Sequence, residues 1–91
     1  MTIHVEFFGI PRVRAGVANA TVMHGRETAS LAEVLDELSV RFPDFSNACI
    51  SDQQLREGYV ASIDGQCFVQ GKAVIVKSDQ SVLILSADAG G

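Results

Sequence analysis

Ser30 to Pro43 reads SLAEVLDELSVRFP, and this stretch decides the fold. Ser30 is followed three residues later by Glu33, the spacing of a capping box, in which each side chain satisfies a free backbone N–H at the start of a helix. Apolar residues then recur at helical spacing and form one stripe, namely Leu31, Val34, Leu35, Leu38 and Phe42. Pro43 disfavours helical geometry at the residue before it. The stretch therefore predicts an amphipathic helix over residues 30–41.

Two strand-like segments precede this helix. Thr2 to Phe8 alternates, with Ile3, Val5 and Phe7 on one face and His4, Glu6 and Phe8 on the other. A second β-prone run covers residues 18–24, after a turn near residues 14–17. We expect the two runs to pair as an antiparallel hairpin, with a connector over residues 25–28.

Three further strands are predicted after the helix. Residues 59–63 form one strand, Asp64-Gly65 favours a type I′ turn, and residues 66–69 form the return strand. The last strand is Ser81 to Ser86, after a polar turn over residues 77–80, and residues 73–76 are expected to pack against the helix. A short helical turn is predicted near residues 52–56. The resulting order is ββαβββ, an α+β arrangement with one main helix laid across a mixed sheet.

Composition excludes several classes of protein. Ninety-one residues make one domain, and the net charge of −4 with only two lysines argues against a nucleic-acid partner. No apolar run approaches the length of a membrane span, and the N-terminus carries no signal-peptide pattern, so we expect a cytoplasmic protein without membrane contact. Cys49 and Cys67 are expected to be free thiols, because neither lies in a metal-binding or redox motif.

The sequence ends in Ala89-Gly90-Gly91, directly after the last predicted strand. We therefore divide the chain into a folded body, residues 1–86, and a flexible tail, residues 87–91. A tail that ends in two glycines can enter a narrow tunnel, because it has no side chains and few torsional restrictions there. Taken alone, such a tail is more typical of a frayed chain end.

Four stretches together resemble the ubiquitin-like β-grasp fold and, more specifically, the MoaD/ThiS family of sulfur carrier proteins. They are Val5–Gly9 with Arg12–Gly16, Ser30–Pro43, Ala61–Gly65 and Asp79–Gly91. The sequence departs from the family in two places: Asp88 stands where prolines are common, and the turn Ser78-Asp79-Gln80 lacks the usual glycine.

The resemblance implies a carrier protein that is not an enzyme by itself, although such carriers serve as the small subunit of a synthase. A partner of the ubiquitin-activating type would adenylate the Gly91 carboxylate with ATP and magnesium. Attack by a sulfur nucleophile would then give a thiocarboxylate, and Gly90 would provide access to it. No intrinsic cofactor or metal is implied. A sulfur-accepting synthase or large subunit would be the second partner, with molybdopterin as the first candidate pathway and cysteine, thiamine or another sulfur metabolite as alternatives.

A docking surface is predicted on the sheet face that points away from the helix. In the preferred register, Val82 and Ile84 point inward, whereas Phe8, Leu83 and Leu85 lie on the outer face and form an apolar partner-binding patch. A shift of one residue would exchange the two faces. We expect no catalytic role for His4, His24 or the helix carboxylates.

Two other functions are compatible with the sequence. The activated tail could be attacked by a lysine amine, which would make the chain a protein modifier. Alternatively, the domain could be a non-covalent binding module in which the tail has no role.

Overall fold

The computed structural model describes residues 2–69 and 74–87 of the chain. Its elements, in chain order, are β1 (Thr2–Phe8), α1 (Ile10–Ala15), β2 (Asn19–Met23), β3 (Thr28–Ser30), α2 (Leu31–Arg41), α3 (Pro43–Cys49), β4 (Ile50–Ser51), β5 (Gln54–Leu55), β6 (Tyr59–Ile63), β7 (Gln66–Val69), β8 (Ile75–Lys77) and β9 (Ser81–Ser86).

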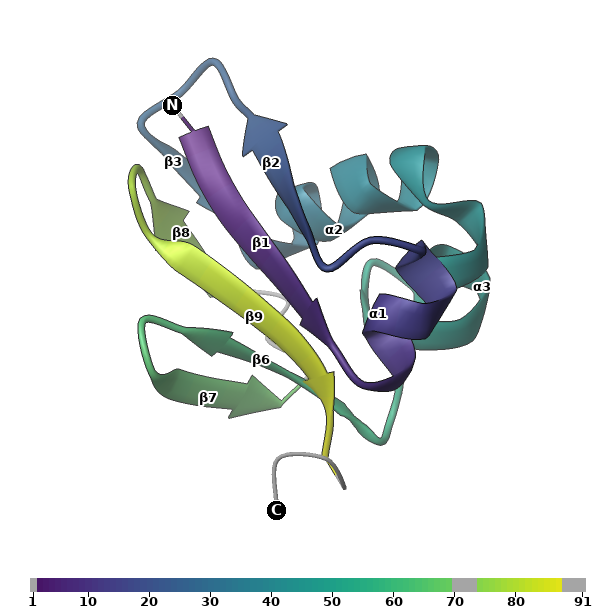
Figure 1. The fold of residues 1–91 in the computed structure, drawn as a ribbon. Coiled ribbons are helices and arrows are strands. Elements are labelled where there is room, and N and C mark those ends of the chain that lie inside the picture. The colour runs from purple at the N-terminus through teal and green to yellow at the C-terminus, as the bar shows by residue number, and fades with distance from the viewer. Residues whose placement is uncertain (1, 70–73, 88–91) are drawn as a thin grey trace.

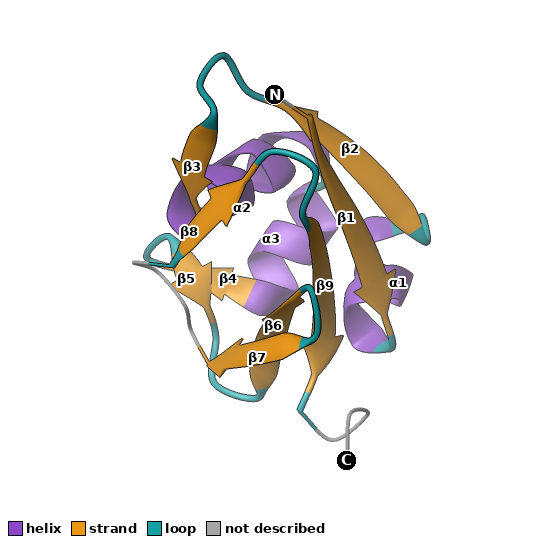
Figure 2. Ribbon diagram, turned by 90° about the vertical axis from the view of Figure 1, so that its left-hand side faces the viewer, coloured by secondary structure: helices purple, strands orange, loops and turns teal. Residues whose placement is uncertain are grey.

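The main sheet is mixed and is covered on one face by helices (Figure 1). Within the described residues, five strands form it in the order β2-β1-β9-β6-β7. The neighbouring strands β1 and β9 are parallel, and the other three pairs of neighbours in this sheet are antiparallel. Helices α2 and α3 lie behind the sheet, and the pair β3–β8 closes the side of the core (Figure 2). The predicted antiparallel pairing of the first two strands is confirmed.

Helix α2 begins and ends where the sequence predicts. The Ser30 hydroxyl accepts from the Glu33 backbone N–H at 3.1 Å, and a Glu33 carboxylate oxygen accepts from the Ser30 N–H at 3.0 Å. The capping box is therefore complete. The apolar stripe is buried at Leu31, Val34, Leu35 and Leu38, and the helix ends at Arg41.

The core lies between α2 and the inner face of the sheet. Ile3, Val5, Val82 and Ile84 are completely buried, so the preferred register of the last strand is confirmed. Phe7 extends the core toward α3, with its ring centroid 5.1 Å from that of Phe45 in an edge-on arrangement. Alternation along β1 and β9 thus fixes which side chains remain on the outer face.

The ββαβββ order omits several short elements. Helix α1 replaces the expected turn after β1, and α3 follows α2 directly. The helical turn predicted near residues 52–56 is wrong: β4 and β5 form a tight hairpin there, with Asp52 and Gln53 at φ values of 54° and 64°. Two left-handed residues are what a two-residue hairpin turn requires.

The remaining turns agree with the sequence analysis. Asp64 and Gly65 have φ values of 49° and 90°, which is the pattern of the predicted type I′ turn. Val76 is buried in the same core cluster as the apolar stripe of α2, in agreement with the packing predicted for residues 73–76, but its strand, β8, was not predicted. Its strand pairs with β3, which begins within the segment that we expected to be a connector.

Candidate functional site

The outer face of the sheet carries a row of apolar side chains across its three middle strands. The register places Phe8 of β1 opposite Leu85 of β9, and Leu85 opposite Val60 of β6. Leu83 lies two residues before Leu85 along β9, on the same face. We call Phe8, Val60, Leu83 and Leu85 the apolar patch. Phe8 is 50% exposed, and Val60 and Leu83 are partly exposed.

Leu85 is less accessible than the sequence predicts. We expected an exposed side chain, but Leu85 is only 9% exposed. It is the middle residue of the row and has a large apolar neighbour on each side, Phe8 and Val60. Leu85 therefore supports the apolar patch from within. The accessible surface of the patch comes mainly from Phe8, Leu83 and Val60.

Val60 belongs to the patch although the sequence analysis assigned it no role. Ala61 and Ile63 are buried, so alternation along β6 turns Val60 and Ser62 to the outer face. The same alternation is visible in the sequence. What the sequence lacks is the information that β6 pairs with β9 in the register that brings Val60 beside Leu85.

Beyond Leu83 the outer face becomes polar. Glu6 and Ser62 lie opposite Leu83 on the two neighbouring strands, and they line a shallow hollow of about 220 Å³ together with Asp64, Gly65, Ser81 and Val82. His4 is exposed on the same face. The apolar patch is thus confined to the half of the sheet near the C-terminal end of β9.

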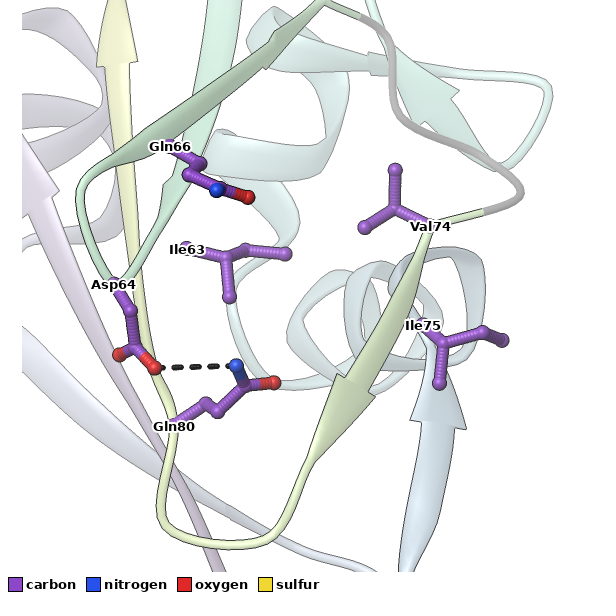
Figure 3. A pocket seen from close by; sticks show the side chains of 6 residues that line it. All are labelled: Ile63, Asp64, Gln66, Val74, Ile75 and Gln80. Atoms are coloured by element: carbon purple, nitrogen blue, oxygen red, sulfur yellow. Dashed lines mark hydrogen bonds between the residues drawn. The ribbon is translucent and has the colours of Figure 1, made fainter.

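Asp64 has a structural role in the described chain. Its carboxylate accepts a hydrogen bond from the Ser81 N–H at 3.1 Å and one from the Gln80 side-chain amide at 3.1 Å. Figure 3 shows the hydrogen bond between Gln80 and Asp64 at the edge of a hollow of about 260 Å³. Ile63 and Val74 line the same hollow. The carboxylate ties the β6–β7 turn to the start of β9.

The tail leaves the body beside the apolar patch. Ser86 at the end of β9 lies opposite Tyr59, and the Ala87 N–H donates to the Gly58 carbonyl at 2.8 Å. Figure 1 shows the chain leaving the tip of β9 at the same end of the molecule as the end of β1. Gly91, the predicted reactive residue, and Gly90, the predicted access residue, lie outside the described residues, as does Asp88.

The cysteines and carboxylates do not assemble a catalytic group in the part of the chain that is described. Cys49 is free and buried. Burial raises the pKa of the Cys49 thiol, which keeps it in the unreactive neutral form. No group of three or more His, Cys, Asp or Glu residues there could hold a metal ion.

His24 and Asp36 have structural contacts. His24 Nδ1 accepts from the Arg26 N–H at 3.3 Å, and its Nε2 lies 3.4 Å from the Glu33 carboxylate. Asp36 accepts from the Gln53 side-chain amide at 3.3 Å. No helix among the described residues has the length and apolar character needed to cross a membrane.

No protein-family model and no curated protein matches this sequence. Solved structures do match it. SAMP1 from Haloferax volcanii, a small archaeal modifier protein, covers 100% of both chains with a TM-score of 0.80 and 17% identity. The fold is the ubiquitin-like β-grasp.

Two further structures share this β-grasp. The putative molybdopterin converting factor subunit 1 from Pyrococcus furiosus aligns over 94% of this chain and 97% of its own, with a TM-score of 0.73 and 16% identity. A chain of the Amycolatopsis orientalis BexX/CysO complex aligns over 98% and 99%, with a TM-score of 0.72 and 22% identity. The predicted β-grasp fold is therefore confirmed, and at these identities the similarity shows the fold alone.

Proposed function

We propose that this chain is a sulfur carrier, activated at the carboxylate of Gly91 by an adenylating partner and not an enzyme by itself. The observation that supports this most strongly is the position of the apolar patch, beside the point where β9 passes into the tail. An exposed apolar surface on a small domain is typical of a protein partner site. A partner that covers this patch would have the tail directly in front of it.

The reaction needs two successive substitutions, the first at the α-phosphorus of ATP and the second at the carboxyl carbon of Gly91. A carboxylate oxygen of Gly91 attacks the α-phosphorus of ATP, pyrophosphate leaves, and an acyl-adenylate forms. A sulfide nucleophile then attacks the carbonyl carbon and AMP leaves, which gives a thiocarboxylate. ATP and magnesium would be bound by the partner, because this sequence contains neither a P-loop nor a glycine-rich dinucleotide-binding motif.

The folded body would bind the partner and position the tail, and it would contribute no reacting atom. Phe8, Leu83 and Val60 supply the apolar surface, and Leu85 supports it from within. The hydrogen bond between Ala87 and the Gly58 carbonyl fixes where the tail begins. Four residues then separate Ala87 from the Gly91 carboxylate, a reach of roughly 13 Å for an extended chain.

The acceptor of the sulfur is proposed to be a synthase subunit in cofactor or metabolite biosynthesis, with molybdopterin as the leading candidate. Two of the similar structures are described as a putative molybdopterin converting factor subunit and as a complex that contains CysO. The proposed site of action is the cytoplasm. A second function, protein modification, is favoured by the likeness to a small archaeal modifier protein.

ATP–pyrophosphate exchange with an adenylating enzyme of the ubiquitin-activating type tests the proposal. We expect exchange with the wild-type chain, none after removal of Gly90 and Gly91, and a strong loss with Leu83→Asp. Val40→Asp is the matched control, because Val40 is 80% exposed on α2, away from the patch. Full exchange by the chain that lacks both glycines would contradict the proposal, and no exchange by the wild-type chain would favour a non-covalent binding module.

Modification and sulfur transfer share the activated intermediate, so a different readout separates them. Tryptic Gly-Gly remnants on substrate lysines, lost when Gly91 is deleted, would assign the modifier function. Their absence, together with a thiocarboxylate on Gly91, would assign the carrier function.

A further inference from the structure

The surface of α1 carries apolar side chains that the fold does not use. Pro11 is buried and Ala15 packs against the core, so this side of the helix faces the body. The opposite side of the helix presents Ile10 and Val13, which are 48% and 78% exposed, and Val17, which follows the C-cap Gly16 just beyond the helix, is 40% exposed. We call these three residues the α1 stripe. A surface helix normally turns polar residues to solvent on this side.

The α1 stripe is a coherent surface. Val13 and Val17 line one shallow hollow of about 330 Å³ together with Arg12, Gly16 and Ala18. Ile10 lies three residues before Val13, on the same side of the helix. It also follows Phe8 of the apolar patch by two residues, across Gly9, whose φ of 71° turns the strand into the helix.

This stripe lies next to the exit of the tail. Helix α1 contacts β9, and Figure 1 shows it beside the end of that strand, at the end of the molecule where the chain leaves the sheet. Arg14 of α1 is close enough to Tyr59 to oppose the rise in the pKa of its phenol that burial causes. Tyr59 lies opposite Ser86, so α1 and the tail exit belong to one region of the surface.

The sequence segment that contains α1 is basic, although the whole chain is acidic. The chain carries a net charge of −4, yet no acidic residue occurs between Glu6 and Glu27, a segment that contains Arg12, Arg14 and Arg26. Helical spacing places Arg12 and Arg14 on the two flanks of the stripe. Within the described residues neither of them takes part in an ion pair, whereas Arg26 is paired with Glu33.

We propose that the α1 stripe, flanked by Arg12 and Arg14, is a second docking element for an acidic, apolar surface on the activating partner. The inference rests on the proposed function, because it assigns the partner that takes up the tail. Specific protein interfaces bury about 800 Å² on each partner, which is more than one row of sheet side chains supplies. The α1 stripe extends the apolar patch on the side where the tail leaves. The two arginines select a partner surface of negative charge.

Steady-state kinetics of ATP–pyrophosphate exchange test the assignment, with each adenylating enzyme of the source genome as the probe. Val13→Asp and Arg12→Glu should each raise the KM for the carrier by about tenfold and leave kcat unchanged, because the tail itself is intact. Raising the salt concentration should increase the KM of the wild-type chain by a larger factor than that of Arg12→Glu. The matched controls are Val40→Asp and Lys77→Glu, exposed residues of the same type on α2 and β8, and both should retain the wild-type KM.

Three outcomes would overturn the inference, and they differ in what else they affect. A wild-type KM for both α1 variants, with normal activation of the wild-type chain, refutes the docking role and leaves the proposed function standing. No activation of the wild-type chain by any of the enzymes refutes both. Binding to phosphatidylserine vesicles that Val13→Asp abolishes, with an unchanged KM, would assign the stripe to a lipid surface instead. Circular dichroism spectra of all variants verify that the fold is retained.

Discussion

Glu33 is the residue whose ionisation most clearly affects the stability of the fold. The backbone N–H of Ser30 is the main cause that lowers the pKa of its carboxyl group from the ordinary value of 4.5, burial opposes this, and the Arg26 guanidinium adds to it. A lowered pKa in the folded state means that the stabilisation is present above about pH 4.5 and is lost as the pH falls through the lowered value.

The first prediction concerns Glu33→Gln. The amide oxygen can still accept from the Ser30 N–H, but the charge is gone, so stability near neutral pH should fall while its dependence on acid becomes weaker. Urea unfolding from about pH 7 to about pH 3 measures this. A variant with the same loss of stability below pH 4.5 as the wild-type chain would show that Glu33 does not contribute through its charge.

The second prediction concerns Asp79, which adopts a φ of 68° in the turn before β9. Left-handed backbone costs a residue with a Cβ atom about 1–2 kcal/mol, and glycine avoids this cost. Asp79→Gly should therefore raise the free energy of unfolding by about 1 kcal/mol. Ser78→Gly is the control, because Ser78 has no positive φ and should gain nothing. Equal effects of both substitutions on the urea midpoint would refute the role of the turn.

At the scale of single residues, the sequence predicts contacts between chain neighbours and misses contacts between strands. The capping box at Ser30 and the turn at Asp64-Gly65 depend on residues at most three apart, and both are confirmed. Val60 and Leu85 depend on the pairing of β6 with β9. Alternation assigns such a residue to a face but does not reveal how strongly its neighbours cover it.

Among the elements, α2 contributes the largest single row of buried side chains. The third prediction is that Leu38→Ala lowers the free energy of unfolding by about 2–5 kcal/mol, because Leu38 is completely buried against the sheet and its removal leaves a cavity. Val40→Ala is the control on the same helix, where 80% of the side chain is exposed. It should change stability by less than about 0.5 kcal/mol. Thermal or urea unfolding that gives equal losses would contradict the assignment of the buried face.

Short elements were the ones that the sequence did not reveal. Pro43 was interpreted as a helix terminator, but it also occupies the first position of α3, where a missing N–H is no disadvantage. Helix α1 has six residues and an exposed apolar stripe, so its pattern is not that of an ordinary amphipathic helix. The three residues of β3 gain their strand conformation from pairing with β8, almost fifty positions away.

For the whole molecule, the core and the proposed chemistry are separate. Within the described residues, the buried apolar side chains all lie between Ile3 and Leu85, and the last backbone contact to the body is made by Ala87. The fourth prediction is that removal of residues 88–91 changes the free energy of unfolding by less than about 0.5 kcal/mol. Comparison of the urea midpoints of the full and shortened chains measures this, and a shortened chain that fails to fold would refute the division into body and tail.

The topology explains how such a separation is built. Parallel pairing of β1 with β9 brings the ends of the two strands together, so Phe8 and the start of the tail lie at one end of the molecule (Figure 1). The ββαβββ order of the main elements was predicted from the long, regular segments, and the β-grasp fold from the resemblance of four stretches to a known family. The classes of partner were predicted only from the family resemblance, because partner recognition depends on surfaces that only the folded chain assembles.

Intact-protein mass spectrometry of the chain, after incubation with its activating enzyme, ATP and a sulfide donor, tests the central claim most directly. We predict a product in which one oxygen of the Gly91 carboxylate is replaced by sulfur, and no such product when Gly91 is deleted. An unchanged mass, under conditions in which the same enzyme adds sulfur to another carrier, would contradict the account.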